Sequence, residues 1–192
     1  SGTILIEALL IALDICPSFI KVKRFIDGHS TWALTQHLWF KKDAILSKDF
    51  LEMTKKINRN TTLKLKQETS FFIGYDNSNK SIQISKESIR IAGPSHFIKI
   101  INANASKIIP EENSNGIIVC NPPYGDRIGD ISYLENLYYE YGENLKNKFN
   151  GYQAWIFTGN PSLRKKIALQ TSKRMPLYNG KIECRLLKYD LY

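Results

Sequence analysis

The chain has 192 residues, enough for one domain with a full hydrophobic core. Its 43% hydrophobic and 23% charged residues are ordinary globular values and exclude a disordered chain. The formal net charge of +9 favours a polyanionic partner such as nucleic acid, although a solvated basic surface would account for the same charge.

The cysteines and the most apolar segment indicate the compartment in which the protein works. Cys16, Cys120 and Cys184 show no CxxC spacing, so we expect neither a zinc site nor a disulfide framework, and a reducing cytoplasm fits best. The apolar run 4–15 contains Glu7, is too short to span a bilayer and lacks the basic flank of a signal peptide. We therefore expect a cytoplasmic protein that has no membrane partner.

The first half of the chain is predicted to be mostly helical, with one buried strand that ends in an acid. In chain order the expected elements are a helix over 4–15, a helical region over 31–57, a strand over 71–76 and a helix over 79–92. The lysines of 31–57 would form a solvated or phosphate-facing side, with Trp32, Leu38, Phe50 and Leu51 available for packing.

The second half alternates strands with helices. The expected elements are strands over 97–101 and 116–120, a helix over 133–149, a strand over 154–157, a helix over 162–169 and a hairpin over 173–192 around Asn179-Gly180. Short apolar strands alternating with helices predict an α/β fold with a mostly parallel sheet, which the closing antiparallel hairpin makes mixed. We expect one domain over residues 1–192.

Ligands of open α/β sheets bind beyond the carboxyl ends of the strands, which selects the loops after Asp76, Ile101 and Cys120. The third loop is Asn121-Pro122-Pro123-Tyr124, and its two prolines make it stiff. A stiff loop can hold the Asn121 side-chain oxygen and the Pro122 carbonyl in fixed directions. A rigid turn that merely caps a buried strand is the alternative.

Two fixed acceptors suit one reaction, the methylation of an amino group on an aromatic ring. The lone pair of such a nitrogen is delocalised, and acceptors that hold its hydrogens would pull it toward tetrahedral geometry and aim the lone pair at a methyl donor. Tyr124 offers a flat face on which an extruded base can stack. The tetrapeptide therefore predicts amino methylation of a nucleobase.

The stretch Val119-Cys120-Asn121-Pro122-Pro123-Tyr124-Gly125-Asp126-Arg127-Ile128 resembles the amino-methyltransferase motif of bacterial ribosomal RNA guanine-N2 methyltransferases of the RlmL type. These enzymes usually carry a THUMP domain and are often labelled N6-adenine-specific DNA methylases. Residues 1–8 resemble the tail of that family's cofactor loop, 74–76 its acidic strand end and 178–184 its closing hairpin. The resemblance covers essentially the whole chain and implies a Rossmann-like S-adenosylmethionine-dependent methyltransferase fold.

The resemblance also implies roles for individual residues. Asn121 and Pro122 would bind the target amine, Tyr124 would stack on the base, and Pro123 and Arg127 would contact the substrate. The residues that would border S-adenosylmethionine are Ser1, Gly2, Thr3, Glu7, Asp76, Asn104 and Ala105. Asp76 would bind the ribose, unless it is only a helix cap. Glu7 is equally well explained as an exposed helix residue, and Arg127 could instead pair with Asp126 or Asp130.

Two features depart from the family pattern. An acidic residue usually meets the adenine amino group where this chain has Asn104, whose amide oxygen would be a weaker acceptor. The family's Asp-Pro and Cys-Gly, the strand before them and the RNA-capturing domain are also missing, so we expect an N-terminally truncated catalytic fragment.

The predicted function is methyl transfer to the N2 amine of a guanine in large-subunit ribosomal RNA, without a metal or a covalent nucleophile. A transfer RNA guanine methyltransferase would share every motif. A DNA adenine-N6 methylase or a protein glutamine methyltransferase would use Asn-Pro-Pro-Tyr as well, although 125–127 and the hairpin argue against both. An inactive RNA-binding remnant is the alternative from another class. The sequence leaves the oligomeric state open.

Overall fold

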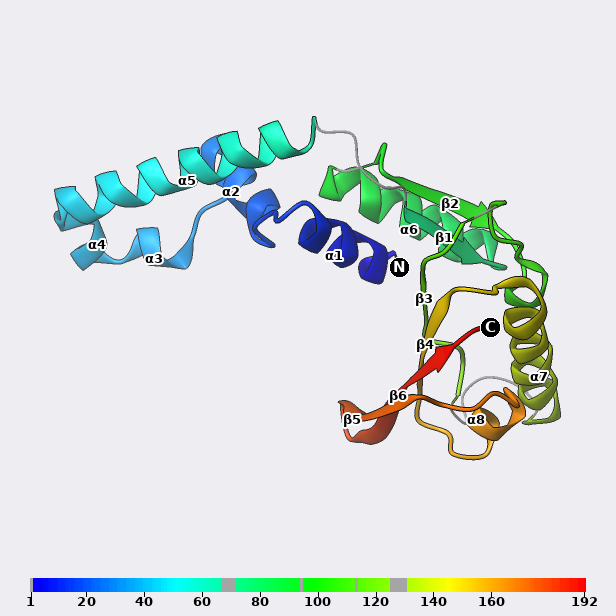
Figure 1. Cartoon of the computed structure of the whole chain (residues 1–192). Helices are drawn as coiled ribbons and strands as arrows, with labels where there is room; N and C mark the ends of the chain where they lie inside the picture. The colour runs from blue at the N-terminus through cyan, green and yellow to red at the C-terminus, as the bar shows by residue number, and fades with distance from the viewer. Residues whose placement is uncertain (1, 67–71, 94, 113, 125–130) are drawn as a thin grey trace. The chain divides into compact units, whose positions relative to one another are not determined.

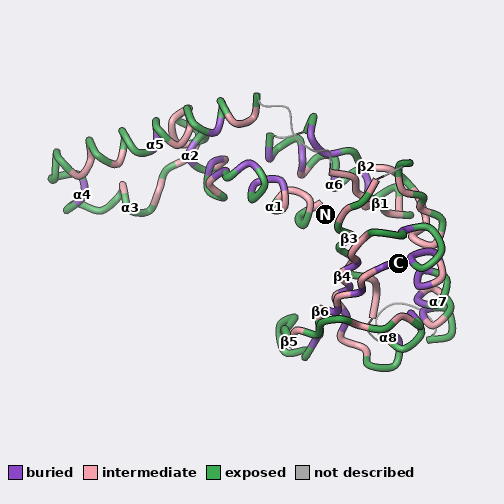
Figure 2. Tube along the Cα trace, in the orientation of Figure 1, coloured by how far each residue is buried: buried purple, intermediate pink, exposed green. Residues whose placement is uncertain are grey.

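The computed structural model describes residues 2–66, 72–93, 95–112, 114–124 and 131–192, and the chain falls into two units, 1–102 and 103–192 (Figure 1). Each unit has a hydrophobic cluster of its own, one around Leu9 and Phe19 and the other around Tyr138 and Leu187. Buried residues accordingly occur in both units (Figure 2). None of the helices in the described ranges is long and apolar enough to cross a membrane.

The first unit combines a helical region with a two-stranded parallel sheet. Its elements are α1 (Thr3–Ala12), α2 (Phe19–Ile26), α3 (Ala33–Gln36), α4 (Leu38–Lys42), α5 (Ala44–Lys64), β1 (Phe72–Asp76), α6 (Asn79–Ala92) and β2 (Ile98–Asn102). The two strands pair from Phe72–Ile98 to Asp76–Asn102, so both carboxyl ends lie at one edge. The predicted helix over 79–92 is confirmed, and it buries Ile82, Ile89 and Ala92.

Gly74 in β1 marks a close approach between the first helix and the sheet. A Cβ atom at this position would lie 2.4 Å from Leu5 Cδ1 of α1 and 2.8 Å from Ile100 Cδ1 of β2. The absence of a side chain at Gly74 therefore lets α1 lie directly on the two strands.

The helical region predicted over 31–57 is confirmed, and it divides into α3, α4 and α5. The chain is extended at Trp32 and His37, and the Asp43 carboxylate starts α5 by accepting a hydrogen bond from Leu46 N at 2.9 Å. The helix α2 was not expected, because a single two-turn segment between Pro17 and Gly28 gives too short a pattern.

Phe50 of α5 is the centre of the packing in this helical region. The rings of Phe25, Trp32 and Phe40 meet it edge to face, with centroid distances of 5.6, 6.0 and 5.6 Å. The expected packing of Trp32 and Phe50 is thus confirmed. The expected packing of two leucines is wrong, since Leu38 is 73% exposed and Leu51 41% exposed.

The second unit is a four-stranded mixed sheet with helices. Its elements are the 3-10 turn η1 (Ala105–Lys107), β3 (Ile117–Cys120), α7 (Ile131–Lys148), β4 (Gln153–Thr158), α8 (Leu163–Lys166), β5 (Lys173–Asn179) and β6 (Ile182–Asp190). The strand order is β3-β4-β6-β5, with β3 and β4 parallel and the two other pairs antiparallel. Alternate residues of β4 are fully buried, and Ala154 and Ile156 pack in one cluster with Tyr138 and Leu145 of α7.

The α/β fold with a closing antiparallel hairpin is confirmed. The hairpin loop consists of Gly180 and Lys181, because Asn179 still pairs with Ile182 as the last residue of β5. Gly180 has φ +61, a left-handed conformation that suits glycine. The loop lies one residue later than the Asn-Gly signal, which leaves the Asn179 side chain at the tip of the sheet.

Gly142 of α7 marks a close approach between this helix and the residue that follows α8. A Cβ atom there would lie 2.1 Å from the carbonyl oxygen of Ile167 and 2.8 Å from its carbonyl carbon. Since these are backbone atoms, the residues after α8 would have to move as a whole to accommodate a side chain. Glycine in the middle of a long helix is therefore explained by packing.

We expect Gly142→Ala to destabilise the chain by about 3 kcal/mol, although alanine is the better helix former. Urea unfolding followed by circular dichroism measures the change. Lys146→Ala, at an exposed position of the same helix, is the control and should shift the free energy of unfolding by less than about 0.5 kcal/mol. Equal stability of the wild-type chain and Gly142→Ala would contradict the packing described here.

Candidate active site

The carboxyl end of β1 places Asp76 in a turn that leads into α6. Its Oδ1 accepts a hydrogen bond from Ser78 N at 2.8 Å, and the Ser78 hydroxyl caps the helix by accepting from Ser81 N at 3.3 Å. Asp76 is therefore not the cap itself, and the cap interpretation falls to Ser78. Among the described residues no hydrogen bond reaches Asp76 Oδ2, so one oxygen of this half-buried carboxylate is available to a ligand.

The start of α1 provides the second feature of the first unit. Gly2 precedes the helix with φ +70, and a Cβ atom there would lie 3.5 Å from Ser85 and Ile89 of α6. The first backbone N–H groups of a helix have no partner within it and carry partial positive charge, which suits an anionic ligand group. Glu7 lies one turn further on and is exposed.

The turn at Asn104 belongs to the second unit and is fixed from two sides. Asn104 Oδ1 accepts from Ser106 N at 3.0 Å and from Ser106 Oγ at 3.2 Å. Asn144, a buried residue of α7, donates from Nδ2 to the carbonyl oxygens of Ala105 at 3.1 Å and Ile108 at 3.0 Å. Sequence reasoning missed Asn144, since a polar residue in a helix gives no sign that it is buried.

The loop after β3 presents Asn121 to solvent, with Pro122 and Pro123 half-buried behind it. Within the described part of the chain, the Asn121 amide has no hydrogen-bond partner. An amide that the fold does not use, on a backbone stiffened by two prolines, is suited to binding a ligand.

Tyr124 packs against the end of β4 and the closing hairpin. Its hydroxyl accepts from Asn179 Nδ2 at 2.9 Å, and the Cys184 thiol lies 3.7 Å away. The ring meets Phe157 edge to face at 6.1 Å, and a Cβ atom at Gly159 would lie 3.0 Å from its Cε2. Burial raises the pKa of Tyr124, so the phenol stays protonated at neutral pH.

Cys120, next to Asn121, is not suited to act as a nucleophile. Burial raises the pKa of its thiol to about 11, an effect that a hydrogen bond with Tyr141 only partly offsets. Almost no thiolate is therefore present at neutral pH.

Tyr138 is another buried polar side chain of this unit. Its hydroxyl forms a hydrogen bond of 3.1 Å with Thr158 Oγ1 of β4, and burial raises the pKa of Tyr138 to about 12.

The predicted residues thus fall into two sets. Gly2, Thr3, Glu7 and Asp76 lie in the first unit. Asn104, Ala105, Asn121, Pro122, Pro123 and Tyr124 lie in the second unit. Ser1 and Arg127 lie outside the described residues. The described residues contain no group of three or more His, Cys, Asp or Glu side chains that could hold a metal ion.

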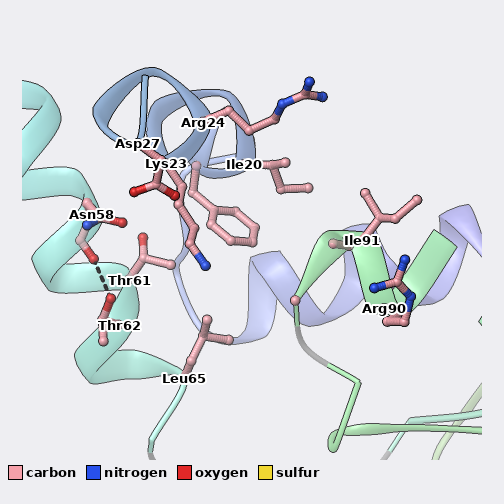
Figure 3. A pocket seen from close by; sticks show the side chains of 13 residues that line it. Ile20, Lys23, Arg24, Asp27, Asn58, Thr61, Thr62, Leu65, Arg90 and Ile91 are labelled. Carbon is pink, nitrogen blue, oxygen red and sulfur yellow. Dashed lines mark hydrogen bonds between the residues drawn. The ribbon is translucent and has the colours of Figure 1, made fainter. Parts of the chain in front are cut away.

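A cavity of about 390 Å³ lies in the first unit, and none of the predicted residues lines it. Figure 3 shows that its walls come from α2, α5 and the end of α6. Lys23 extends from α2 toward α5, where Thr62 Oγ1 donates to the Asn58 carbonyl at 2.9 Å (Figure 3). The basic residues Lys23, Arg24 and Arg90 and the acidic residue Asp27 line the cavity.

Solved structures match the entire chain and define the fold as that of a methyltransferase. SMU.472, crystallised with SAH, has a TM-score of 0.78 at 22% identity, and a possible methylase from Clostridium difficile 630 has 0.74 at 26%. The chain covers 46% of each of these proteins. The sequence profile of UPF0020, the RMKL-like methyltransferase domain, matches residues 1–188, and the chain belongs to this family.

Curated relatives agree with this assignment. The ribosomal RNA large subunit methyltransferase K/L of Syntrophotalea carbinolica is 35% identical over 194 residues, and that of Shewanella loihica is 31% identical over 192 residues. Both alignments cover 100% of this chain. The chain spans about a quarter of the length of each relative (25%).

The hydrogen bond between Asn179 and Tyr124 should be measurable as a coupling energy. We expect Asn179→Ala and Tyr124→Phe each to lower the free energy of unfolding, and the double variant to lose about 0.5–1 kcal/mol less than the sum. Urea unfolding of the four proteins gives the coupling. Strict additivity would mean that the two side chains do not interact in solution.

Proposed function

We propose that this chain transfers a methyl group from S-adenosylmethionine to the N2 amine of a guanine in large-subunit ribosomal RNA. The observation that carries the proposal is the Asn121 amide, which is exposed and without a partner among the described residues, on a loop stiffened by two prolines beside Tyr124. Membership of the RMKL-like family and the similarity to ribosomal RNA large subunit methyltransferases K/L support the choice of ribosomal RNA.

The chemistry required of Asn121 and Pro122 is to activate a weak nucleophile. Their oxygens would accept the two N–H bonds of the target amine, so that its lone pair is no longer shared with the ring. The amine nitrogen then attacks the methyl carbon in line. The bond from that carbon to sulfur breaks with its electron pair on sulfur, and the nitrogen afterwards loses a proton to water. The two oxygens stabilise the positive charge that develops on nitrogen.

Tyr124 would stack on the extruded guanine. A residue that stacks on a base needs a fixed ring orientation. Asn179 holds the Tyr124 hydroxyl, and Phe157 and Gly159 lie against the ring. Since burial keeps the Tyr124 phenol protonated, the ring brings no charge to the base. Base–aromatic stacking of this kind contributes ~1–3 kcal/mol per base.

The residues present fit the cofactor. Asp76 Oδ2 has no partner among the described residues and would accept hydrogen bonds from the ribose hydroxyls. Gly2 and Thr3 would border the methionine end, where the start of α1 favours a carboxylate. Bound S-adenosylmethionine supplies a methyl group on a cationic sulfur, so the protein chiefly orients and desolvates the reactants.

The structure changes the role that we propose for Asn104. A backbone N–H is always a donor, so the atom that meets Ser106 N must be the Asn104 amide oxygen, and the Ser106 hydroxyl lies against the same oxygen. The remaining Nδ2 is a donor. Asn104 would therefore donate to a ring nitrogen of the adenine, where the family's acidic residue would accept from the amino group, and Ala105 would border the ring.

Loss of the Asn121 amide should abolish transfer while leaving the cofactor bound. We expect Asn121→Ala to reduce transfer of labelled methyl to undermethylated large-subunit ribosomal RNA by about 100-fold or more, as for removal of a transition-state hydrogen bond. The dissociation constant for S-adenosylmethionine, measured by calorimetry, should stay unchanged. Asn147→Ala, at an exposed asparagine of α7, is the matched control.

Nucleoside analysis of the labelled RNA decides between the alternatives. N2-methylguanosine in large ribosomal RNA is the expected product. Label in transfer RNA, or as N6-methyladenine in DNA, would replace the proposed substrate. Cofactor binding without transfer to any nucleic acid would remove the enzyme proposal and leave a binding protein.

The ribose contact has a separate test. Asp76→Asn keeps an oxygen for Ser78 N but removes the charge, so we expect the dissociation constant for S-adenosylmethionine to rise roughly tenfold with little loss of stability. Asp49→Asn, at an exposed acid of α5, serves as the control. Unchanged affinity in Asp76→Asn would show that this carboxylate does not hold the ribose.

A further inference from the structure

The positive charge of the chain is concentrated in one region. Residues 16–66, which comprise α2 to α5, contain 11 of the 27 lysines and arginines and only 4 of the 18 aspartates and glutamates. The region therefore carries +7 of the net charge of +9, and the other 141 residues carry +2. Such a concentration of positive charge favours association with a polyanion.

The long helix α5 displays much of this charge away from its packed face. Lys55, Lys56 and Arg59 are exposed, whereas Thr54 and Thr61 face inward and are buried. Within the described ranges, no carboxylate lies within 4.0 Å of these three cations. Acidic side chains offset part of the charge of α5: Lys48 pairs with Glu52 at 4.0 Å, Lys64 pairs with Asp14 at 2.7 Å, and Asp49 is exposed on the same helix.

An exposed aromatic pair lies beside further cations in and next to α4, directly before α5. The His37 and Trp39 rings stack with centroids 5.8 Å apart and 18° between their planes, and Trp39 is 57% exposed. Lys41 and Lys42 follow directly in α4 and are also exposed. Cations beside an exposed flat ring are the combination with which proteins bind single-stranded nucleic acid.

The packing of the region does not require the exposed cations of α5. Its core is the edge-to-face cluster around Phe50, to which Phe25, Trp32 and Phe40 contribute. Lys21 lies 4.2 Å from the centre of the Trp32 ring and belongs to this packing. Lys55, Lys56 and Arg59 can therefore be replaced without removing the core. The Trp39 ring borders the cluster, since it meets Phe40 edge to face at 6.2 Å.

We propose that residues 16–66 form an RNA-binding surface, on which the α5 cations contact backbone phosphates and Trp39 stacks on an unpaired base. The proposal rests on the proposed function only for the choice of RNA as the polyanion. The cavity beneath α2 supports it, because Lys23 extends into the space beside α5 and has no ion pair among the described residues. Asp27 lines the same cavity and would limit its affinity for a phosphate.

The decisive experiment compares two triple variants of the full chain that lose the same charge. Lys55→Gln/Lys56→Gln/Arg59→Gln removes three cations from the surface, and Lys146→Gln/Lys148→Gln/Lys165→Gln removes three exposed cations from the second unit. The probe is a fluorescein-labelled RNA hairpin with a single-stranded loop. Fluorescence anisotropy measures its dissociation constant over a series of salt concentrations.

We expect the surface variant to bind this RNA about 10- to 100-fold more weakly near 0.1 M salt, with a logarithmic salt slope smaller by about 2. The control variant should stay within about threefold of the wild-type chain. Trp39→Ala should weaken binding roughly tenfold without changing the salt slope, because a stacking contact releases no counterions. Melting curves by circular dichroism confirm that the variants are folded.

Three outcomes would overturn the proposal: a wild-type chain that does not bind the hairpin, equal losses in the two triple variants, or tighter binding to phosphatidylserine vesicles than to RNA. The same measurements distinguish failure of the proposed RNA-binding surface from failure of the proposed methyl transfer. Methyl transfer without any change in the surface variant's RNA affinity would leave the enzyme and remove the surface. RNA binding that depends on the surface, without methyl transfer to any acceptor, would do the reverse.

Discussion

The order of strands in the second unit is the constraint on which its candidate site depends. β3 and β4 run parallel, so the loops after Cys120 and after Thr158 leave the sheet at the same edge. β6 runs antiparallel to β4, which brings the first residues of β6 and the last of β5 to that edge as well. Tyr124 therefore meets Gly159, Cys184 and Asn179, although these residues are 35 to 60 positions away in the chain.

Motifs were easier to predict than the residues that support them. Local patterns predict the strand ends at Asp76 and Cys120, the helix over 79–92 and the hairpin. Each of these patterns acts within a few residues: an apolar run, Gly93 at the end of the helix (φ +91), and an Asn-Gly pair. Asn179 and Asn144 act on residues 55 and 39 positions away, so no local pattern identifies them. The helical region over 31–57 was predicted, but its division into three helices was not, since lysines and apolar residues of helical spacing do not show where His37 extends the backbone.

The role of Asn104 shows how a local contact can reverse an inference from residue type. An asparagine in place of an acid suggests a weaker acceptor at the same position. The fold, however, uses the amide oxygen to hold Ser106, and what remains is a donor. The buried Asn144 donates to two carbonyl oxygens of the same turn, so the geometry of the turn depends on its contact with α7.

The division of charge between the parts of the chain fits two tasks with different physical demands. Activation of an amine needs a few neutral acceptors in fixed directions, which Asn121 and Pro122 would supply under the proposed function. Capture of a polyanion needs many cations in no fixed geometry, since counterion release depends on their number. Residues 16–66 supply the cations for capture of a polyanion and contain none of the residues predicted to activate the amine. A methyltransferase could therefore change its RNA affinity through this helical region while the chemistry at Asn121 stayed the same.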